Sequence, residues 1–364
     1  MTKQKGKKQI IEPWCFGSTR QADFKNAVTH AAFDLFARKQ HGHLGDIAYL
    51  NGGGKLYEKF MSANNAYALF SGEISNITAH RDALVKDLSD TQRAIIVGPG
   101  PGSSFEQKEM QLLKLLPDLK EVHFVDLNNE FNRQGAMIVK NYARKNKLSI
   151  RVETHEMDFR NAAAVIPQRE HTTVLSTGSL VSNVPNAPLN AFPDYDTGRF
   201  IDGFAVLAGE GGKVVLGYDS NDSAKNLEQS YNNDLAPFIE NIMKIIVDHS
   251  SSIRGLDAAK GNFRYESAWL KQAGQVAHKL IAEKAQTFQI IFDGNVHGFF
   301  IEEGDEYIVM SSLRPKVERL TKIAQNIGMK TESVYVSDSG IVDQVFTVKR
   351  APSPARLPVI IPQV

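Results

Sequence analysis

One stretch near residue 100 constrains the fold more than any other part of this chain of 364 residues. It starts with an apolar run at residues 94–97, long enough for a buried parallel strand. The chain then turns on the sequence GPGPG, a helical pattern opens at Glu106, and a second apolar run over residues 122–125 ends at Asp126. A strand, a glycine turn, a helix and a strand ending in a carboxylate form the first half of a nucleotide-binding α/β unit.

The residue types in this unit indicate which ligand it binds. Gly98 and Gly100 let the backbone turn tightly, so that its amide groups approach a ligand without an intervening Cβ atom. Asp126 ends its strand at the edge of the sheet, where its two acceptor oxygens can hold a ribose diol. A dinucleotide-binding turn normally has a third glycine, which lets the helix come close to the pyrophosphate; here Ser103 occupies that position. The sequence therefore favours S-adenosylmethionine, which has no phosphate, over a nicotinamide dinucleotide.

Composition narrows the class of protein. With 42% hydrophobic and 23% charged residues the chain has the composition of a soluble globular protein, and its length favours two domains. A formal net charge of +1 gives no reason to expect binding to nucleic acid or to an anionic membrane. Cys15 is the only cysteine, which excludes an internal disulfide and a cysteine-based zinc site. No residues have clear metal-ligand spacing; His41 and His43 stand two apart, which is weak evidence, and no metal is predicted.

The sequence pattern predicts neither a membrane span nor a secretion signal. No apolar run reaches the roughly 18 residues that a bilayer span needs. The basic segment MTKQKGKKQII lacks the apolar core of a secretion signal. We expect a cytoplasmic protein with a solvated tail at residues 1–12 and a proline-rich tail at residues 351–364.

Periodicity predicts the remaining elements. Expected helices cover residues 23–39, a segment beginning at Leu56 after a glycine turn, and residues 77–88, 132–145, 238–246 and 315–327. Expected strands cover residues 150–154, 172–176 and 213–217, a run of antiparallel segments over residues 289–310, and the closing segments SVYVS and VFTVK on either side of Asp338–Gly340.

Polar residues follow the third and fourth predicted strands, where α/β sheets bind ligands. Asp158 and Phe159 place an acid beside an aromatic ring, a combination that suits adenine by amide hydrogen bonding and stacking. Asn183 can both donate and accept a hydrogen bond. The closing hairpin is not typical of dinucleotide-binding domains, whereas S-adenosylmethionine-dependent methyltransferases end their sheet in this way. The predicted fold class is therefore α/β, a Rossmann-like class I methyltransferase sheet with an antiparallel last strand.

The order of these segments resembles the histidine-specific, S-adenosylmethionine-dependent methyltransferases, whose best-known member trimethylates the amino group of histidine for ergothioneine synthesis. The resemblance covers residues 47–350. It rests on YLNGGGKLYEKF, VGPGPG with FVD, EMDF, STGSLVSN, KVVLGYDSNDSAKNLEQSYNND and EEGDEYIVMSSLRPKVERLTKIAQNIGMKTESVYVSDSG. The segment KVVLGYD is the most specific, because in the family such a strand precedes a short helix whose tyrosine points into the substrate pocket. Asp219 and Tyr231 match that pattern.

The resemblance implies roles for individual residues. The methyl donor would be held by Gly98, Gly100, Asp126, Asp158 and Phe159. The carboxylate and amine of an amino-acid substrate would be held by Asn183 and Tyr231, with Tyr67 as a further wall. The resemblance also implies two domains: residues 72–218 with 314–350 would bind the donor, and residues 13–71 with 219–313 would form an α+β substrate-binding domain.

One departure from the family bears on the substrate. In the family an acid, and a serine two residues later, hold the imidazole of histidine; here Ser312 matches the serine, but Met310 stands in place of the acid. A thioether cannot usefully accept an imidazole N–H, and losing that partner would cost about 1–3 kcal/mol of binding. An apolar or aromatic side chain would suit Met310 better. Alternatively, Met310 is a core residue in a different strand register.

The predicted reaction is methyl transfer to the amino group of a small amino acid or an amino-acid-derived metabolite. Because an ammonium group cannot attack, Tyr231 or Asp219 is a candidate to accept the proton or to stabilise the cation. Two alternatives from other classes stay open, a donor-binding protein without catalysis and a nicotinamide-dependent oxidoreductase. The sequence makes no prediction of the oligomeric state.

Overall fold

The computed structural model of this chain describes residues 21–37, 44–49, 52–63, 67–184, 187–231 and 234–349. The predicted tails at residues 1–12 and 351–364 lie outside the described residues, as do Cys15, His41 and His43.

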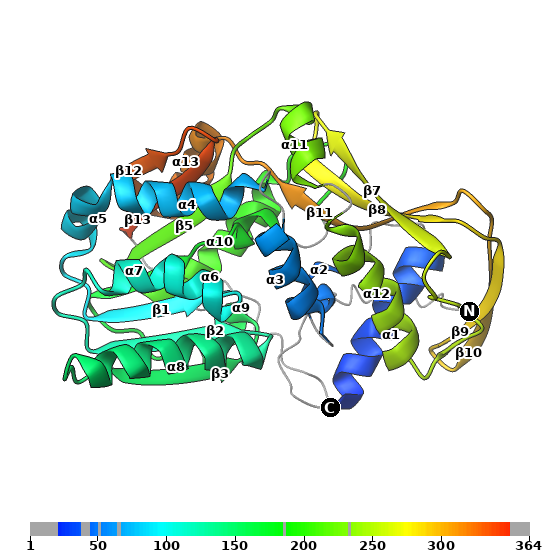
Figure 1. The fold of residues 1–364 in the computed structure, drawn as a ribbon, viewed down its shortest axis with the longest axis horizontal. Coiled ribbons are helices and arrows are strands. Elements are labelled where there is room, and N and C mark those ends of the chain that lie inside the picture. The colour runs from blue at the N-terminus through cyan, green and yellow to red at the C-terminus, as the bar shows by residue number, and fades with distance from the viewer. Residues whose placement is uncertain are drawn as a thin grey trace, which may run out of the picture.

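A seven-stranded sheet forms the larger part of the fold, with the strand order β12-β13-β5-β4-β1-β2-β3 (Figure 1). The strands are β1 (Arg93–Val97), β2 (Glu121–Asp126), β3 (Arg151–Glu156), β4 (Thr172–Ser176), β5 (Lys213–Asp219), β12 (Met329–Val336) and β13 (Ile341–Val348). Strands β1 to β5 are parallel, whereas β13 runs antiparallel to both of its neighbours. This confirms the predicted Rossmann-like sheet with an antiparallel last strand.

Helices cover both faces of the sheet, which explains why the central strand β1 is apolar along its whole length. Ala94 and Ile96 point to one apolar cluster, and Ile95 and Val97 point to another on the opposite face. The first face is covered by α4 (Ala68–Ala79), α5 (Arg81–Leu88), α6 (Gly102–Gln107), α7 (Glu109–Leu113) and α8 (Asn129–Lys145). The second face is covered by α9 (Phe159–Ala162), α10 (Asp194–Ala208) and α13 (Val317–Asn326).

Two predicted helices are interrupted in the structure. The helix expected from Glu106 begins earlier, at Gly102, and breaks at Lys108, whose φ of −117° and ψ of −88° leave the helical region. The break lets the Lys108 side chain enter the interior and reach Glu73. The single helix expected over residues 77–88 is likewise two helices, which meet at His80. In both places the prediction of one continuous helix was wrong.

The rest of the described chain lies beside the seven-stranded sheet (Figure 1). It packs around a separate apolar cluster. Its helices are α1 (Gln21–Ala37), α2 (Gly45–Ala48), α3 (Gly53–Ala63), α11 (Ala224–Ser230) and α12 (Ala236–His249). Its strands are β6 (Ile253–Arg254), β7 (Phe263–Leu270), β8 (Gln275–Ala282), β9 (Gln286–Phe292), β10 (Asn295–Ile301) and β11 (Glu306–Leu313). They form two antiparallel sheets in the orders β10-β9-β6 and β11-β8-β7. The sequence predicted β9 to β11 but missed the β7–β8 hairpin; the proposed domain boundaries stay a prediction.

Among the described helices, none combines the length and the apolarity that a membrane span needs.

Candidate active site

Two adjoining cavities open where the parallel strands end. The first, with a volume of about 140 Å³, is bordered by the residues that follow β1, β2, β3 and β4: Gly98–Pro101, Asp126–Asn128, Met157–Arg160 and Thr177–Gly178. The second, of about 40 Å³, is lined by Tyr231, His278, Met310, Ser312 and Arg314, among others. The two cavities share five lining residues, Tyr49, Tyr57, Tyr67, Gly178 and Asn183, which we call the shared wall.

The glycine turn forms the floor of the first cavity. Gly98 and Gly100 both have positive φ angles, 68° and 66°, which residues with a Cβ atom rarely adopt. The Gly98 N–H donates to the carbonyl of Val125 at 3.0 Å, which ties the turn to β2. A Cβ atom at Gly98 would approach Leu180 to 3.3 Å, whereas one at Gly100 would meet nothing within 4 Å. The turn at Gly100 therefore presents bare backbone to open space.

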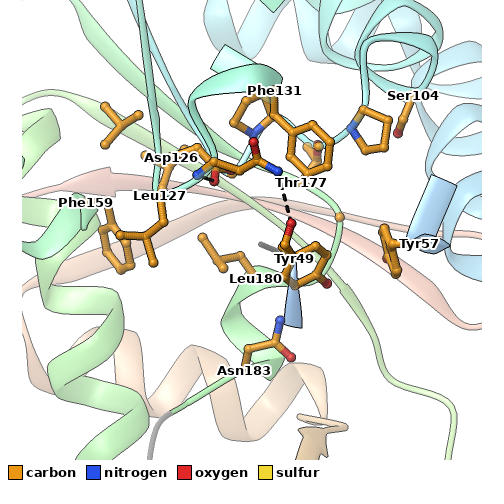
Figure 2. A pocket seen from close by; sticks show the side chains of 18 of the residues that line it. Tyr49, Tyr57, Ser104, Asp126, Leu127, Phe131, Phe159, Thr177, Leu180 and Asn183 are labelled. Carbon is orange, nitrogen blue, oxygen red and sulfur yellow. Dashed lines mark hydrogen bonds between the residues drawn. The ribbon is translucent and has the colours of Figure 1, made fainter. Parts of the chain in front are cut away.

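Asp126 stands at the end of β2 on the rim of the same cavity. Its Oδ1 accepts the backbone N–H of Asn128 at 2.6 Å, which fixes the orientation of the carboxylate. Asn128 in turn donates to the carbonyl of Tyr49 at 3.3 Å, so the rim is joined to the shared wall (Figure 2). Figure 2 also places Leu127 and Phe159 on the same side of the cavity as Asp126.

Asp158 and Phe159 line the first cavity, as predicted from their position, but both also have structural partners. Asp158 caps α9 by accepting the N–H of Arg160 at 2.9 Å, and it forms an ion pair with the Arg160 guanidinium. The Phe159 ring stacks on Phe204, with ring centroids 4.4 Å apart and an angle of 7° between the planes. One ring face of Phe159 is therefore covered within the core.

A buried ionic network that the sequence did not reveal borders the first cavity. The Lys108 ammonium lies 2.6 Å from Glu73 Oε2 and 3.7 Å from Glu109 Oε1. Glu73 Oε1 accepts the Gly178 N–H at 2.6 Å, which links the network to the shared wall. Burial acts to lower the pKa of Lys108, but Glu109 and Glu73 outweigh it and the pKa is raised, so the side chain stays an ammonium. No local pattern marks this pairing, because Glu73 lies on α4 and Lys108 lies 35 residues later, at the break between α6 and α7.

The second cavity contains a buried arginine that the sequence analysis also missed. Arg314 donates to the Tyr231 hydroxyl, and its Nε lies 3.2 Å from Asp219 Oδ2. Asp219 itself is not part of the lining of either cavity, so it acts on the site through Arg314. Burial raises the pKa of Tyr231, although Arg314 opposes this, and the phenol keeps its proton at neutral pH. Spacing could have revealed Arg314, because it stands two residues after Ser312 and residues two apart on an extended chain project to the same face.

Met310 and Ser312 lie on the same face of β11 and both line the second cavity. Met310 is also a buried member of the apolar cluster around which this part of the chain packs. It is therefore both a core residue and a residue that lines the cavity. Its strand-pairing partner on β8 is His278, whose Nε2 lies 3.3 Å from Ser312 Oγ and whose Nδ1 lies 2.8 Å from the Tyr265 hydroxyl. The sequence missed His278 because the hairpin that carries it was not predicted.

Tyr67 and Asn183 stand in the shared wall, between the groups of the two cavities. The Tyr67 hydroxyl lies 3.3 Å from that of Tyr57, and its ring meets Tyr231 edge to face at 5.8 Å. Asn183 follows a short 3₁₀ helix, η1 (Leu180–Ser182), at the carboxyl side of β4. The structure thus brings together all the predicted substrate residues and, in the adjoining cavity, all the predicted donor residues.

The first cavity fits S-adenosylmethionine group by group. Bare backbone at Gly100 leaves room for close approach, and the Asp126 carboxylate suits a ribose diol. Asp158, Leu127 and Phe159 offer a hydrogen-bond acceptor and apolar surface for an adenine. Lys108 also borders the cavity, where its ammonium is already paired with Glu73 and Glu109.

Comparison with known proteins identifies the family. A family model described as histidine-specific methyltransferase, SAM-dependent, matches residues 43–349. No curated protein matches the chain.

Several solved structures resemble the fold at low sequence identity. An S-adenosylmethionine-dependent methyltransferase from Clostridium acetobutylicum ATCC 824 is 12% identical, with 81% of this chain and 96% of that chain covered and a TM-score of 0.42. The amino pentose methyltransferase CalS10 from Micromonospora echinaspora is 11% identical, with 75% of this chain and 90% of that chain covered and a TM-score of 0.34. The sugar N-methyltransferase KedS8 from Streptoalloteichus sp ATCC 53650 is 12% identical, with 81% and 92% covered and a TM-score of 0.36. These values are too low to carry a substrate from any of these proteins to this chain.

Proposed function

The chain belongs to the family of histidine-specific, SAM-dependent methyltransferases, and from that premise we propose that it methylates the amino nitrogen of a small amino acid or amino-acid-derived metabolite whose side chain is apolar or aromatic. The observation that carries the proposal is the second cavity, which combines a polar group set at Arg314 and Tyr231 with an apolar floor at Met310. The family match supports this over the oxidoreductase alternative and over donor binding without catalysis.

In this proposal the first cavity holds the donor. S-adenosylmethionine supplies an electrophilic methyl group when it is bound. We assign Gly98 and Gly100 to close backbone contact, Asp126 to the ribose hydroxyls, and Asp158 and Phe159 to the adenine. Because these groups are fixed by turns, caps and ion pairs before any ligand arrives, they cost little reorganisation on binding.

The second cavity holds the acceptor. A guanidinium, a phenol and a carboxamide, from Arg314, Tyr231 and Asn183, surround one part of it and can bind a substrate carboxylate. Phe60, Leu235, Phe238, Ile239 and Met310 contribute apolar surface to the rest. Replacing the carboxylate of the histidine-binding pattern by Met310 removes the acceptor that an imidazole N–H needs, so histidine is a poor fit.

The residues around the acceptor nitrogen position it and do not act as strong bases. The nitrogen must arrive without its proton, because an ammonium has no lone pair. Tyr231 keeps its own proton at neutral pH, so we assign it to orienting the amine and stabilising the cation, with solvent taking the proton. Asp219 is a positioning residue in this scheme, because it contacts Arg314 and not the cavity. Alignment of two bound partners can contribute several kcal/mol to methyl transfer.

A screen with isotopically labelled S-adenosylmethionine tests the proposal. Purified protein is incubated with each amino acid and with a metabolite extract, and labelled products are identified by mass spectrometry. We expect labelled amines from acceptors with apolar or aromatic side chains and little product from histidine. Histidine as the best acceptor, or labelling confined to oxygen atoms, would contradict the proposal.

The substitution Met310→Glu sharpens that test. A carboxylate beside Ser312 restores a partner for an imidazole, so we expect the ratio of kcat/KM for histidine to that for the best acceptor to rise about tenfold, as one charged hydrogen bond supplies. Met310→Leu is the matched control, because it keeps the apolar surface and should leave the ratio unchanged. An equal ratio in all three proteins would remove Met310 from acceptor selection.

A further inference from the structure

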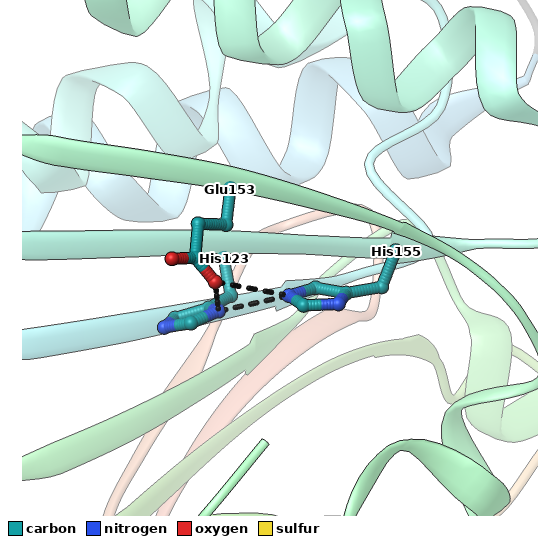
Figure 3. Close-up of side chains that lie close together, drawn as sticks. All are labelled: His123, Glu153 and His155. Carbon is teal, nitrogen blue, oxygen red and sulfur yellow. Dashed lines mark hydrogen bonds and ion pairs between the residues drawn. The ribbon is translucent and has the colours of Figure 1, made fainter. Parts of the chain in front are cut away.

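Three potential metal ligands lie together on the β3 edge of the seven-stranded sheet, outside the lining of both cavities (Figure 3). His123 on β2 pairs in register with Glu153 on β3, and His155 lies two residues further along β3. Residues paired in register, and residues two apart on one strand, project to the same face. The fold therefore directs an imidazole, a carboxylate and a second imidazole to one point, although the three are too scattered in sequence to form a motif.

The distances between the ligand atoms match those around a small transition-metal ion. His123 Nδ1 lies 2.9 Å from His155 Nε2 and 3.6 Å from Glu153 Oε2, and the latter two atoms are 3.9 Å apart. Tetrahedral zinc with bonds of about 2.0–2.2 Å separates its ligand atoms by about 3.4 Å. The three separations thus lie within about 0.5 Å of that spacing.

The groups behind the ligands hold them in the required orientation. His123 Nε2 lies 3.0 Å from Glu121 Oε1 and 3.3 Å from Arg93 Nε. With a metal on Nδ1, the ring proton sits on Nε2 and Glu121 accepts it. Glu153 Oε1 lies 3.2 Å from Arg151, which leaves Oε2 facing the two imidazoles. A carboxylate behind a ligating histidine is the usual support in zinc sites.

Charge decides which metal suits the cluster. Arg93, Arg151 and Arg169 lie around Glu121, and their charge opposes any cation. Arg151 and Arg169 are about half exposed, so solvent screens them strongly. The remaining repulsion disfavours Mg²⁺ and Ca²⁺, whose binding is purely ionic, more than metals with a high affinity for imidazole.

We propose that His123, Glu153 and His155 form a binding site for a zinc-class transition-metal ion that ties β3 to β2. Without metal, the two imidazoles share one N–H···N hydrogen bond; on binding, the donating ring moves that proton to its other nitrogen, so that His123 Nδ1 and His155 Nε2 both face the metal. His155 is followed by Met157 and Asp158 in the wall of the first cavity, so the ion also braces that wall. Three protein ligands leave one position of the tetrahedron for water.

Metal titration of the whole chain tests this proposal. The protein is stripped with a chelator and then titrated calorimetrically with Zn²⁺, and separately with Mg²⁺. A second sample is titrated with Co²⁺, and its visible absorption reports the coordination geometry. We expect one Zn²⁺ per chain, a tetrahedral Co²⁺ spectrum, a higher Tm with Zn²⁺ and no comparable binding of Mg²⁺.

Variants assign the site. Glu153→Gln and His155→Ala each remove one ligand from a partly exposed position, and we expect at least about tenfold weaker Zn²⁺ binding in each. His171→Ala is the matched control, because it removes an exposed histidine that is not part of the cluster. Thermal melts of the metal-free variants check that they fold. Absence of a stoichiometric Zn²⁺ site, equal affinity in all four proteins, or Mg²⁺ binding as tight as Zn²⁺ binding would overturn the proposal.

Discussion

The two cavities share a wall, yet they are constructed in different ways. Most groups around the first cavity follow the ends of four neighbouring parallel strands, so their positions are set by the order of those strands. The second cavity collects side chains from α3, α12, β8 and β11, which the chain reaches at widely separated points. The difference teaches that sheet topology sets the residues of the first cavity, whereas packing between separate elements sets those of the second.

We expect the largest effect from replacing Lys108. Its ion pairs border the first cavity, yet they join residues from separate parts of the chain, so they are an exception to the contrast above. Lys108→Met leaves Glu73, Glu109 and Asp343 in the interior without their cation. Breaking a buried pair in this way costs about 3–5 kcal/mol, so we expect the free energy of unfolding in urea to fall by that order. Lys114→Met is the matched control, since Lys114 is an exposed neighbour, and it should change stability very little.

This loss should depend on pH. The raised pKa of Lys108 means that its contribution is fully present below 10.5, and therefore throughout the neutral range. In the variant, burial already raises the pKa of Glu109 and of Asp343, and loss of the cation raises both further. The variant's native state then holds protons that its unfolded state releases, so its stability falls as pH rises. Urea unfolding should show a wider gap to wild type at pH 8 than at pH 5; a constant gap would argue against charge as the cause.

The next largest expected effect is on donor binding, and it is tested by replacing the carboxylate at the end of β2. Asp126→Asn keeps an oxygen that can accept the Asn128 N–H but weakens the proposed grip on the ribose. We expect the Kd for S-adenosylhomocysteine, measured by calorimetry, to rise about tenfold to a hundredfold, the equivalent of about 1.5–3 kcal/mol for hydrogen bonds to a charged group. Asp118→Asn, in the exposed connection before β2, provides the control. An unchanged Kd in Asp126→Asn would remove this carboxylate from the donor site.

The same contrast explains what the sequence could predict. The glycine turn, Asp126 and Asp158 were identified because residues that follow parallel strands must meet at one sheet edge. Asn183 was identified in the same way, from its place after β4. The predicted substrate residues Tyr67, Tyr231, Met310 and Ser312 came from a family resemblance, and the structure gathers all five around the second cavity and the shared wall.

What escaped prediction depends on side chains that meet only in the folded chain. Arg314, His278 and Lys108 each owe their place to a partner on another element, and no local pattern marks such pairs. The β7–β8 hairpin was missed because its residues are polar and apolar in irregular alternation. The same limit hid the cluster of His123, Glu153 and His155, which two neighbouring strands bring together.

A smaller effect on the acceptor side tests whether the second cavity governs turnover. Tyr231→Phe removes the hydroxyl that meets Arg314, so we expect kcat to fall about tenfold while the Kd for S-adenosylhomocysteine changes less than about twofold. Tyr335→Phe is a suitable control, because its hydroxyl bonds to Asp87 away from both cavities. If donor affinity fell as much as kcat, the separation between the two sides would be wrong.

The smallest effect uses two glycines with similar φ angles. Gly100 and Gly211 have φ angles of 66° and 77°, and a Cβ atom at either meets nothing within 4 Å. Alanine at each should cost about 1 kcal/mol of stability through left-handed strain, seen as similar decreases in Tm. Only Gly100→Ala should also weaken S-adenosylhomocysteine binding, since only Gly100 lines the first cavity. Equal donor affinity in the two variants would show that the turn acts on stability alone.

The shared wall sets a rule for anyone who wishes to redesign this enzyme. Tyr49, Tyr57, Tyr67, Gly178 and Asn183 touch both ligands' compartments, so a change there alters two affinities at once. Met310, Ser312 and His278 border only the smaller compartment. Libraries that vary those three positions can search for new acceptors while the machinery for methyl delivery stays intact.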